Sequence, residues 1–104
     1  MNISICDDEI KIQEEIAAFI NRAYPQSRIA SFSDGETVLA SIKACPEKLP
    51  DLLLLDIDMP GISGMEVAAA LAEEKARTLI VFVTAHDELV YDSFKYHPFA
   101  FVRK

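Results

Sequence analysis

Residues 51–64, DLLLLDIDMPGISG, contain four consecutive leucines followed at once by an acid, and then by a proline and two glycines. A short, wholly apolar run predicts a strand buried on both faces, and the proline and glycines predict an irregular loop after it. Asp56 would then lie at the carboxyl end of a central strand. Open α/β sheets bind their ligands at that edge, so Asp56 is a candidate site residue, although an acid there can also simply start a surface turn.

Length and composition predict one globular domain that spans residues 1–104. The 51% hydrophobic content is enough for a core, and the net charge of −7 argues against binding nucleic acid or an anionic membrane by charge. The N-terminus has neither a basic start nor a long apolar stretch, so we expect a cytoplasmic protein. Cys6 and Cys45 are far apart and not in a metal-ligand spacing, so we expect both to be reduced.

Short apolar runs alternate with helical patterns along the whole chain. The first helix is closed by Pro25, the second runs to about Ala44, the third opens at Ser63, and a short fourth covers 86–95. Strands are predicted at 2–6, 28–32, 52–55, 79–83 and 99–104. This alternation predicts a parallel sheet, because parallel neighbours need a crossover and the crossover is a helix.

Helical spacing also predicts which side chains point to the core. In the first helix the apolar stripe is expected to leave Gln13 on another face. The side chains expected to point inward are Ile12, Ile16, Phe19, Ile20 and Ala23 in the first helix, Val38, Leu39 and Ile42 in the second, and Ala68, Leu71 and Ala72 in the third.

Two segments have the spacing of a capping box. Ser33 is followed three residues later by Glu36, and Ser63 by Glu66, each just before an apolar helical pattern. In such a box the serine hydroxyl and the glutamate carboxylate each accept a hydrogen bond from the other residue's backbone N–H. We therefore expect Ser33 and Ser63 to cap the second and third helices.

Polar side chains lie at or just past the carboxyl ends of four of the predicted strands. They are Asp7 and Asp8, Asp56, Thr84 and Lys104. Right-handed crossovers bring the carboxyl ends of parallel strands to one edge of the sheet, so we expect these residues to converge. Taken singly, each has an ordinary explanation: Asp7 and Asp8 could cap the first helix, and Lys104 could be a solvated terminal residue.

Three converging carboxylates repel one another, each pair by roughly 4 kcal/mol at about 4 Å and an effective dielectric near 20. Either one acid keeps its proton or a cation lies among them. Oxygen ligands without cysteine or histidine favour Mg²⁺. A phosphoryl oxygen could complete such a site, with the Thr84 hydroxyl and the Lys104 ammonium positioned to complement its charge.

Together these residues resemble the receiver domain of two-component response regulators. The resemblance is carried by the acid pair Asp7-Asp8, by Asp56 with Met59-Pro60 and Gly64 after it, by Thr84-Ala85 and by Lys104. It covers essentially the whole chain. It implies a doubly wound, five-stranded parallel sheet of flavodoxin-like order 2-1-3-4-5.

The resemblance also implies a function. Asp56 would accept a phosphoryl group from a phosphohistidine on a sensor histidine kinase. Mg²⁺ would be held by Asp7 or Asp8, by Asp56 and by the backbone carbonyl of Asp58. Thr84 and Lys104 would contact the phosphoryl oxygens. Such a domain is a phosphoacceptor rather than an enzyme, with at most slow self-dephosphorylation.

The switch residue and the output are implied in the same way. Phe101 matches the family's aromatic switch position, where it would act by burial alone. The sequence over 93–101 resembles receivers whose output is a LytTR-type DNA-binding domain, so the expected output is transcriptional, through a domain that this chain does not contain.

The end of the chain departs from the family. No proline follows Lys104 and no fifth helix follows the fifth strand, so the sequence resembles a receiver truncated there. In that case the sheet face beside the first helix would be partly bare. We expect this face to be covered by another molecule, through a dimer or an exchange of elements, or else the domain to be only marginally stable. The fourth helix and fifth strand are the other candidate surface for a homodimer.

Two other functions stay open. Asp56 and Asp58 have the spacing of nucleophile and general acid in haloacid-dehalogenase-like phosphohydrolases, although that motif usually follows the first strand. Turnover of a phosphate ester would distinguish this enzyme from a switch that takes up one phosphoryl group. A degenerate receiver used only as an interaction scaffold is the third possibility.

Overall fold

Five parallel strands form the middle layer of the fold, in the order β2-β1-β3-β4-β5. The computed structural model describes residues 1–44, 49–57, 59–73, 77–84 and 100–103. The doubly wound fold and strand order expected from the sequence are confirmed; the predicted fourth helix, 86–95, lies outside the described residues. The elements are β1 (Asn2–Cys6), α1 (Ile10–Ala23), β2 (Arg28–Phe32), α2 (Gly35–Ala44), β3 (Leu52–Asp56), α3 (Gly64–Glu73), β4 (Leu79–Thr84) and β5 (Ala100–Arg103).

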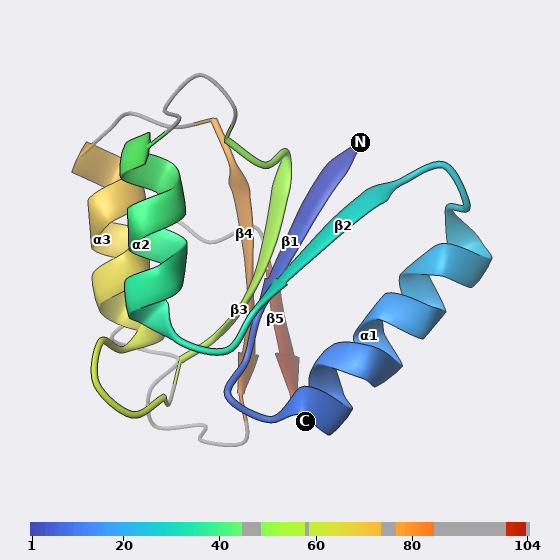
Figure 1. Cartoon of the computed structure of the whole chain (residues 1–104), viewed down its shortest axis with the longest axis horizontal. Coiled ribbons are helices and arrows are strands. Elements are labelled where there is room, and N and C mark those ends of the chain that lie inside the picture. The colour runs from blue at the N-terminus through green and yellow to red at the C-terminus, as the bar shows by residue number, and fades with distance from the viewer. Residues whose placement is uncertain (45–48, 58, 74–76, 85–99, 104) are drawn as a thin grey trace.

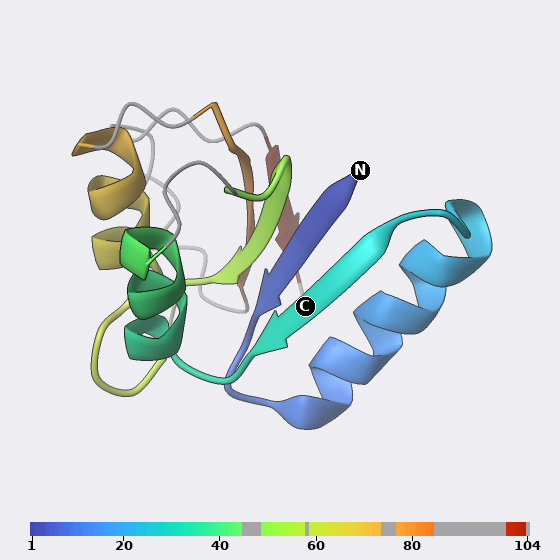
Figure 2. The ribbon, with the colours of Figure 1, turned by 45° about the horizontal axis from the view of Figure 1, so that its top comes forward.

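The two faces of the sheet are covered unequally. Helices α2 and α3 lie on one face and α1 on the other (Figures 1 and 2). Leu53 and Leu55 of β3 are fully buried toward α2 and α3, whereas Leu52 and Leu54 are half-buried toward α1. The prediction that this strand is buried on both faces is therefore right for one face only, because a single described helix covers the other.

The strand register brings the polar strand ends together. The last rung between β1 and β3 pairs Cys6 with Leu55, so Asp7 and Asp56 come next on neighbouring strands. Thr84 ends β4 and is paired with Arg103 of β5.

No helix in the described ranges is long and apolar enough to cross a bilayer.

Helix α1 faces the sheet with a different stripe from the predicted one. Gln13 and Ile20 are buried, while Phe19 is 67% exposed and Ala23 is exposed too, so Gln13, Phe19 and Ala23 were wrongly placed. The buried stripe runs through Gln13, Ile16 and Ile20, at the spacing i, i+3, i+7 that a helix face requires. In α3, Ala72 is likewise exposed, and Val67 is buried together with the expected Ala68 and Leu71.

One capping box is wrong and half of the other is confirmed. Asp34, not Ser33, caps α2: its Oδ1 accepts hydrogen bonds from the backbone N–H and the hydroxyl of Thr37, at 2.7 and 2.6 Å, which lower the pKa of Asp34. Glu36 instead accepts the backbone N–H of Ile62 at 3.2 Å. At α3, the Ser63 hydroxyl accepts the N–H of Glu66 at 3.4 Å, as expected.

Gly64 lets α3 begin directly against the end of β3. Its backbone N–H donates to the Ile57 carbonyl at 3.0 Å. A Cβ on this residue would collide with the backbone carbonyl oxygen of Asp56 and would lie 2.8 Å from the Ile57 Cα. Because backbone atoms cannot move aside as a flexible side chain does, glycine is required here by the close approach itself.

We expect Gly64→Ala to destabilise the domain by about 2–4 kcal/mol, since the added methyl forces the end of β3 away from α3. Denaturant unfolding measures the change. Glu73→Ala, an exposed substitution at the other end of α3, should alter stability by no more than about 0.5 kcal/mol. A Gly64→Ala protein as stable as the parent would mean that the approach is not tight.

Candidate metal and phosphoryl-acceptor site

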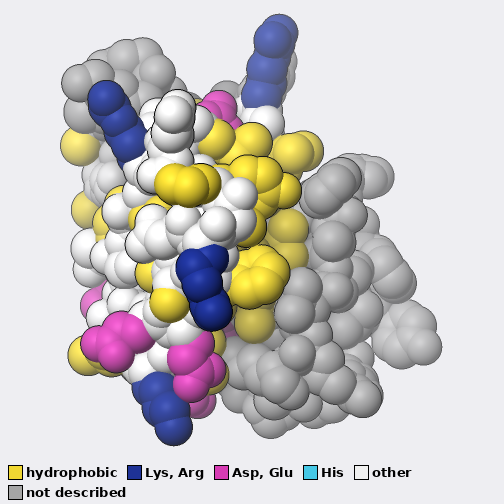
Figure 3. All heavy atoms as spheres, turned by 90° about the vertical axis from the view of Figure 1, so that its right-hand side faces the viewer, with side chains coloured by type: hydrophobic (Ala, Val, Ile, Leu, Met, Phe, Trp, Pro, Cys, Tyr) yellow, Lys and Arg dark blue, Asp and Glu magenta, His cyan; other side chains and the backbone are white. Residues whose placement is uncertain are grey.

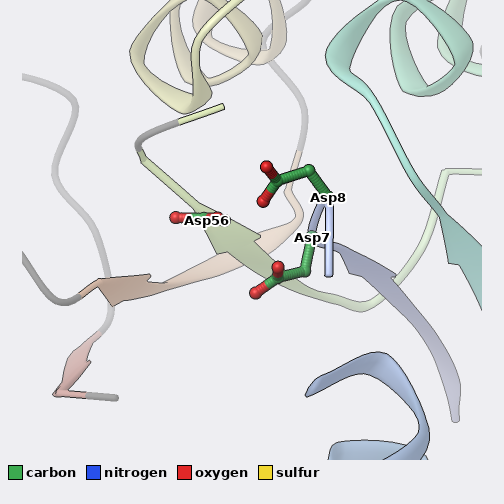
Figure 4. A group of neighbouring side chains, drawn as sticks. All are labelled: Asp7, Asp8 and Asp56. Atoms are coloured by element: carbon green, nitrogen blue, oxygen red, sulfur yellow. The ribbon is translucent and has the colours of Figure 1, made fainter. Parts of the chain in front are cut away.

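Three carboxylates meet at the carboxyl edge of the sheet. Asp7 and Asp8 follow β1 and Asp56 ends β3, and one oxygen from each lies within 4.8 Å of the others. Figure 4 shows the three side chains gathered at the ends of the two strands. Asp7 is 1% exposed and Asp56 2%, whereas Asp8 is open to solvent. The site therefore has two buried acids and one acid at its rim.

Backbone contacts hold Asp7 in place. Its N–H donates to the Phe32 carbonyl at 3.1 Å, and its Oδ1 accepts the N–H of Glu9 at 2.9 Å. The N-cap position of α1 is occupied by Glu9, which makes no side-chain cap bond. Neither Asp7 nor Asp8 therefore occupies the N-cap position of α1. Both residues lie in the turn between β1 and α1.

The electrostatics of this arrangement favour a cation. Two charges within 4.8 Å repel by at least about 3 kcal/mol at an effective dielectric of 20, and burial of Asp7 and Asp56 excludes the water that would screen them. Asp8, at the rim, is screened more strongly. An all-oxygen donor set with one exposed member fits Mg²⁺, which binds one or two carboxylates and keeps several waters.

The other predicted site residues are described only in part. Thr84 lies at the end of β4, and Phe101 is paired in register with Phe82 of β4; for both, the structure describes the backbone. Asp58 and Lys104 lie outside the described residues. The roles in metal binding, phosphoryl binding and switching that the sequence predicts for these residues stay predictions. The same holds for the roles of Asp7, Asp8 and Asp56.

Cys6 lies beside the acids but is not suited to join them. Its thiol is buried, 3.5 Å from the Asp34 carbonyl oxygen and 3.6 Å from the Met59 sulfur. Burial, together with the nearby carboxylates of Asp34 and Asp56, raises the pKa of Cys6 to about 12. A thiol of this kind stays protonated in the metal-free protein, and Cys6 packs as a member of the hydrophobic core. Cys45 lies outside the described residues.

Gln13 contacts this site and was missed from the sequence. Its amide nitrogen lies 2.6 Å from the Asp7 carbonyl oxygen, so α1 reaches back to the end of β1. The available signal was its spacing from Ile16 and Ile20, which places a polar residue on the buried stripe of the helix.

Comparison with known proteins places this chain in a family. Residues 3–104 match the model of the response regulator receiver domain. The chain is 38% identical over 96 residues to the positive alginate biosynthesis regulatory protein of Pseudomonas aeruginosa, covering 91% of this chain and 38% of that protein. It is 36% identical over 104 residues to the transcriptional regulatory protein BtsR of Escherichia coli, covering 100% of this chain and 42% of that protein.

Solved structures of response regulator proteins are also similar to this chain. TrrA from Thermotoga maritima, crystallised in complex with Mg(2+)-BeF, is 31% identical with a TM-score of 0.84, over 99% of this chain and 85% of that one. The response regulatory domain of mrkE from Klebsiella pneumoniae is 30% identical with a TM-score of 0.87, over 100% and 83%. The chain spans about two-fifths of the length of the curated relatives above. It belongs to the response regulator receiver domain family.

Proposed function

We propose that this domain is a phosphoacceptor switch in which Asp56 receives a phosphoryl group from a phosphohistidine on a sensor histidine kinase, in a Mg²⁺-dependent reaction. The observation that carries the proposal is the meeting of Asp7, Asp8 and Asp56 within 4.8 Å at the end of the central strand. Family membership supports it. Phosphorylation would change the interaction surface of the domain and so control an output domain.

The transfer forms one bond and breaks one. A carboxylate oxygen of Asp56 attacks phosphorus, the P–N bond to the histidine breaks, and the electron pair stays on the imidazole nitrogen, which takes a proton from solvent. Bound Mg²⁺ would supply positive charge that offsets the charge of the carboxylates and of the phosphoryl group. Asp7 and Asp8 would hold that ion, while β3 fixes the backbone from which Asp56 attacks. Thr84 and Lys104 are assigned to the phosphoryl oxygens.

The partners follow from the same proposal. Two relatives carry names that describe regulators of alginate biosynthesis and of transcription. Another, 28% identical over 104 residues, is the sensory transduction protein LytT of Bacillus subtilis. These likenesses support a transcriptional output, for which we propose a DNA-binding domain of the LytTR type. A cytoplasmic location beside a sensor kinase is part of the proposed phosphotransfer.

An aspartyl phosphate that is released slowly distinguishes this switch from a phosphohydrolase. The dehalogenase-like alternative needs Asp58 as general acid, and Asp58 lies outside the described residues. The family model that matches the chain is that of the receiver. We therefore propose that the domain is not an enzyme, apart from slow loss of its own phosphoryl group.

Incubation with Mg²⁺ and a small phosphodonor should raise the intact mass by a single phosphoryl group, and Asp56→Asn should abolish the rise because an amide is a poor nucleophile. Asp51→Asn is the matched control: Asp51 immediately precedes β3 at its opposite end, where it accepts the Asn2 N–H at 2.8 Å. It should be phosphorylated normally. Phosphorylation that persists in Asp56→Asn would place the acceptor elsewhere, and continuous turnover of the donor would indicate a phosphohydrolase.

Replacing both Asp7 and Asp8 by asparagine should abolish Mg²⁺ binding and, in EDTA, raise the free energy of unfolding by about 1–3 kcal/mol, because the repulsion with Asp56 is removed. Calorimetric titration and thermal melts measure the two effects. Glu14→Gln with Glu15→Gln makes the same charge change at exposed positions of α1 and should leave Mg²⁺ binding intact. A less stable Asp7/Asp8 variant in EDTA would show that these acids support the turn more than they crowd the site.

Association with a second copy is a further part of the proposal. A groove of about 770 Å³ lies between α1 and the sheet, lined mostly by apolar side chains that include Phe19, Tyr24, Leu52, Leu54 and Leu79. Figure 3, which looks at the side of the molecule that carries α1, shows exposed hydrophobic side chains among charged ones. We propose this face as a homodimer surface. The other candidate surface, around the fourth helix and fifth strand, falls mainly outside the described residues.

Sedimentation velocity tests the dimer. The sedimentation coefficient should rise with protein concentration, and Phe19→Glu should remove that rise, because it places a charge in the groove at a residue that is already 67% exposed. Ala18→Glu, an exposed neighbour on α1 that is not among the groove residues, serves as the control. A protein that sediments as a monomer at every concentration would contradict the proposal.

A further inference from the structure

Strands β1 and β2 end on the same rung, and one backbone hydrogen bond continues beyond it. The last rung between β1 and β2 pairs Cys6 with Phe32, and the Asp7 N–H still donates to the Phe32 carbonyl at 3.1 Å. The next rung would bring a backbone donor from β2 to the Asp7 carbonyl. Beyond Phe32, however, the chain leaves the sheet to begin α2 at Gly35. The buried Asp7 carbonyl therefore needs another donor.

Gln13 supplies that donor from α1. Its Nε2 lies 2.6 Å from the Asp7 carbonyl oxygen, 3.0 Å from the Phe32 carbonyl oxygen and 3.2 Å from the Ser33 hydroxyl. Both carbonyls can only accept, so the amide must turn its nitrogen toward them. The two N–H groups of one side chain are thus shared among three oxygens, at a residue that is itself 7% exposed.

These hydrogen bonds connect the acid site to the end of β2 and to α1. Asp7 is held through its N–H by Phe32 and through its carbonyl by Gln13, which also bonds Phe32 and Ser33. The side chain of Asp7 has little freedom once its backbone is fixed, since its Oδ1 also accepts the Glu9 N–H. The direction of the Asp7 carboxylate toward Asp8 and Asp56 therefore depends on Gln13.

We propose that Gln13 is a positioning residue of the acid site, which sets the Mg²⁺ affinity of the domain through the backbone of Asp7. The inference rests on the proposed function. The Gln13 nitrogen bonds backbone carbonyls and the Ser33 hydroxyl, so Gln13 acts in place of the next rung between β1 and β2. Metal ligands must be held to within about half an ångström, and removing a residue that orients a ligand typically lowers metal affinity by about 10- to 100-fold.

The test is Gln13→Met, which keeps the length of the side chain and removes both N–H donors. Calorimetric titration with Mg²⁺ should show a dissociation constant about ten-fold higher than in the parent. Backbone amide resonances in the metal-free protein should shift at Asp7 and Asp8 more than elsewhere in the site. Phosphoryl uptake at low Mg²⁺ should slow by a similar factor and recover as Mg²⁺ is raised, because the lost step is binding of the ion.

Ile20→Val is the matched control for stability. Ile20 lies on the same buried stripe of α1, and its truncation weakens the helix packing without touching the end of β1. It should bind Mg²⁺ as the parent does. If Gln13→Met fails to fold, Gln13→Asn keeps a polar amide that is one methylene too short to reach all three oxygens, and its Mg²⁺ affinity should fall at least about five-fold.

The outcomes separate the inference from the proposed function. A parent protein that binds no Mg²⁺ and accepts no phosphoryl group overturns the proposed function, and the inference with it. A parent that binds and reacts normally, beside a folded Gln13→Met or Gln13→Asn protein whose Mg²⁺ affinity stays within about two-fold, overturns the inference alone. An equal loss in Ile20→Val would likewise overturn it, because stability rather than position would then set the affinity.

Discussion

Repulsion among Asp7, Asp8 and Asp56 is the constraint on which the rest of this structure depends. Parallel strands β1 and β3 end side by side, so their acids are held within 4.8 Å whether or not anything balances their charge. A cost of a few kcal/mol is large against a domain stability of about 5–15 kcal/mol. The fold tolerates this cost because Leu53, Leu55 and Phe82 are fully buried between the sheet and the helices α2 and α3. The same repulsion makes the site ready for a cation.

The described part of the site was predictable because topology places it. Apolar runs that end abruptly in acids locate the carboxyl ends of β1 and β3, and the alternation of strands with helices brings those ends to one edge. No packing detail is needed for either step. Asp7, Asp8 and Asp56 therefore meet as expected, and Thr84 lies at the end of β4. Asp58 and Lys104, outside the described residues, stay predictions.

Details that depend on the rotation of a helix or on a choice between neighbouring polar residues were not predictable in the same way. Phe19 extends the apolar pattern of α1 but is 67% exposed, while Gln13 shares the buried stripe with Ile20. Asp34 caps α2 in place of the adjacent Ser33, whose hydroxyl lies 3.2 Å from the Gln13 nitrogen instead. At α2 the sequence offers two adjacent capping residues of similar chemistry, and on α1 it offers apolar residues on more than one face of the helix. Three-dimensional contacts select between them.

The central claim is that the three acids form one cation site from which Asp56 reacts. A magnesium titration followed by two-dimensional NMR of the backbone amides tests it most directly. The account predicts saturable shifts concentrated at Asp7, Asp8 and Asp56, with the acidic surface of α1 around Glu14 and Glu15 unaffected. Shifts that never saturate, or that spread evenly over all exposed carboxylates, would contradict it.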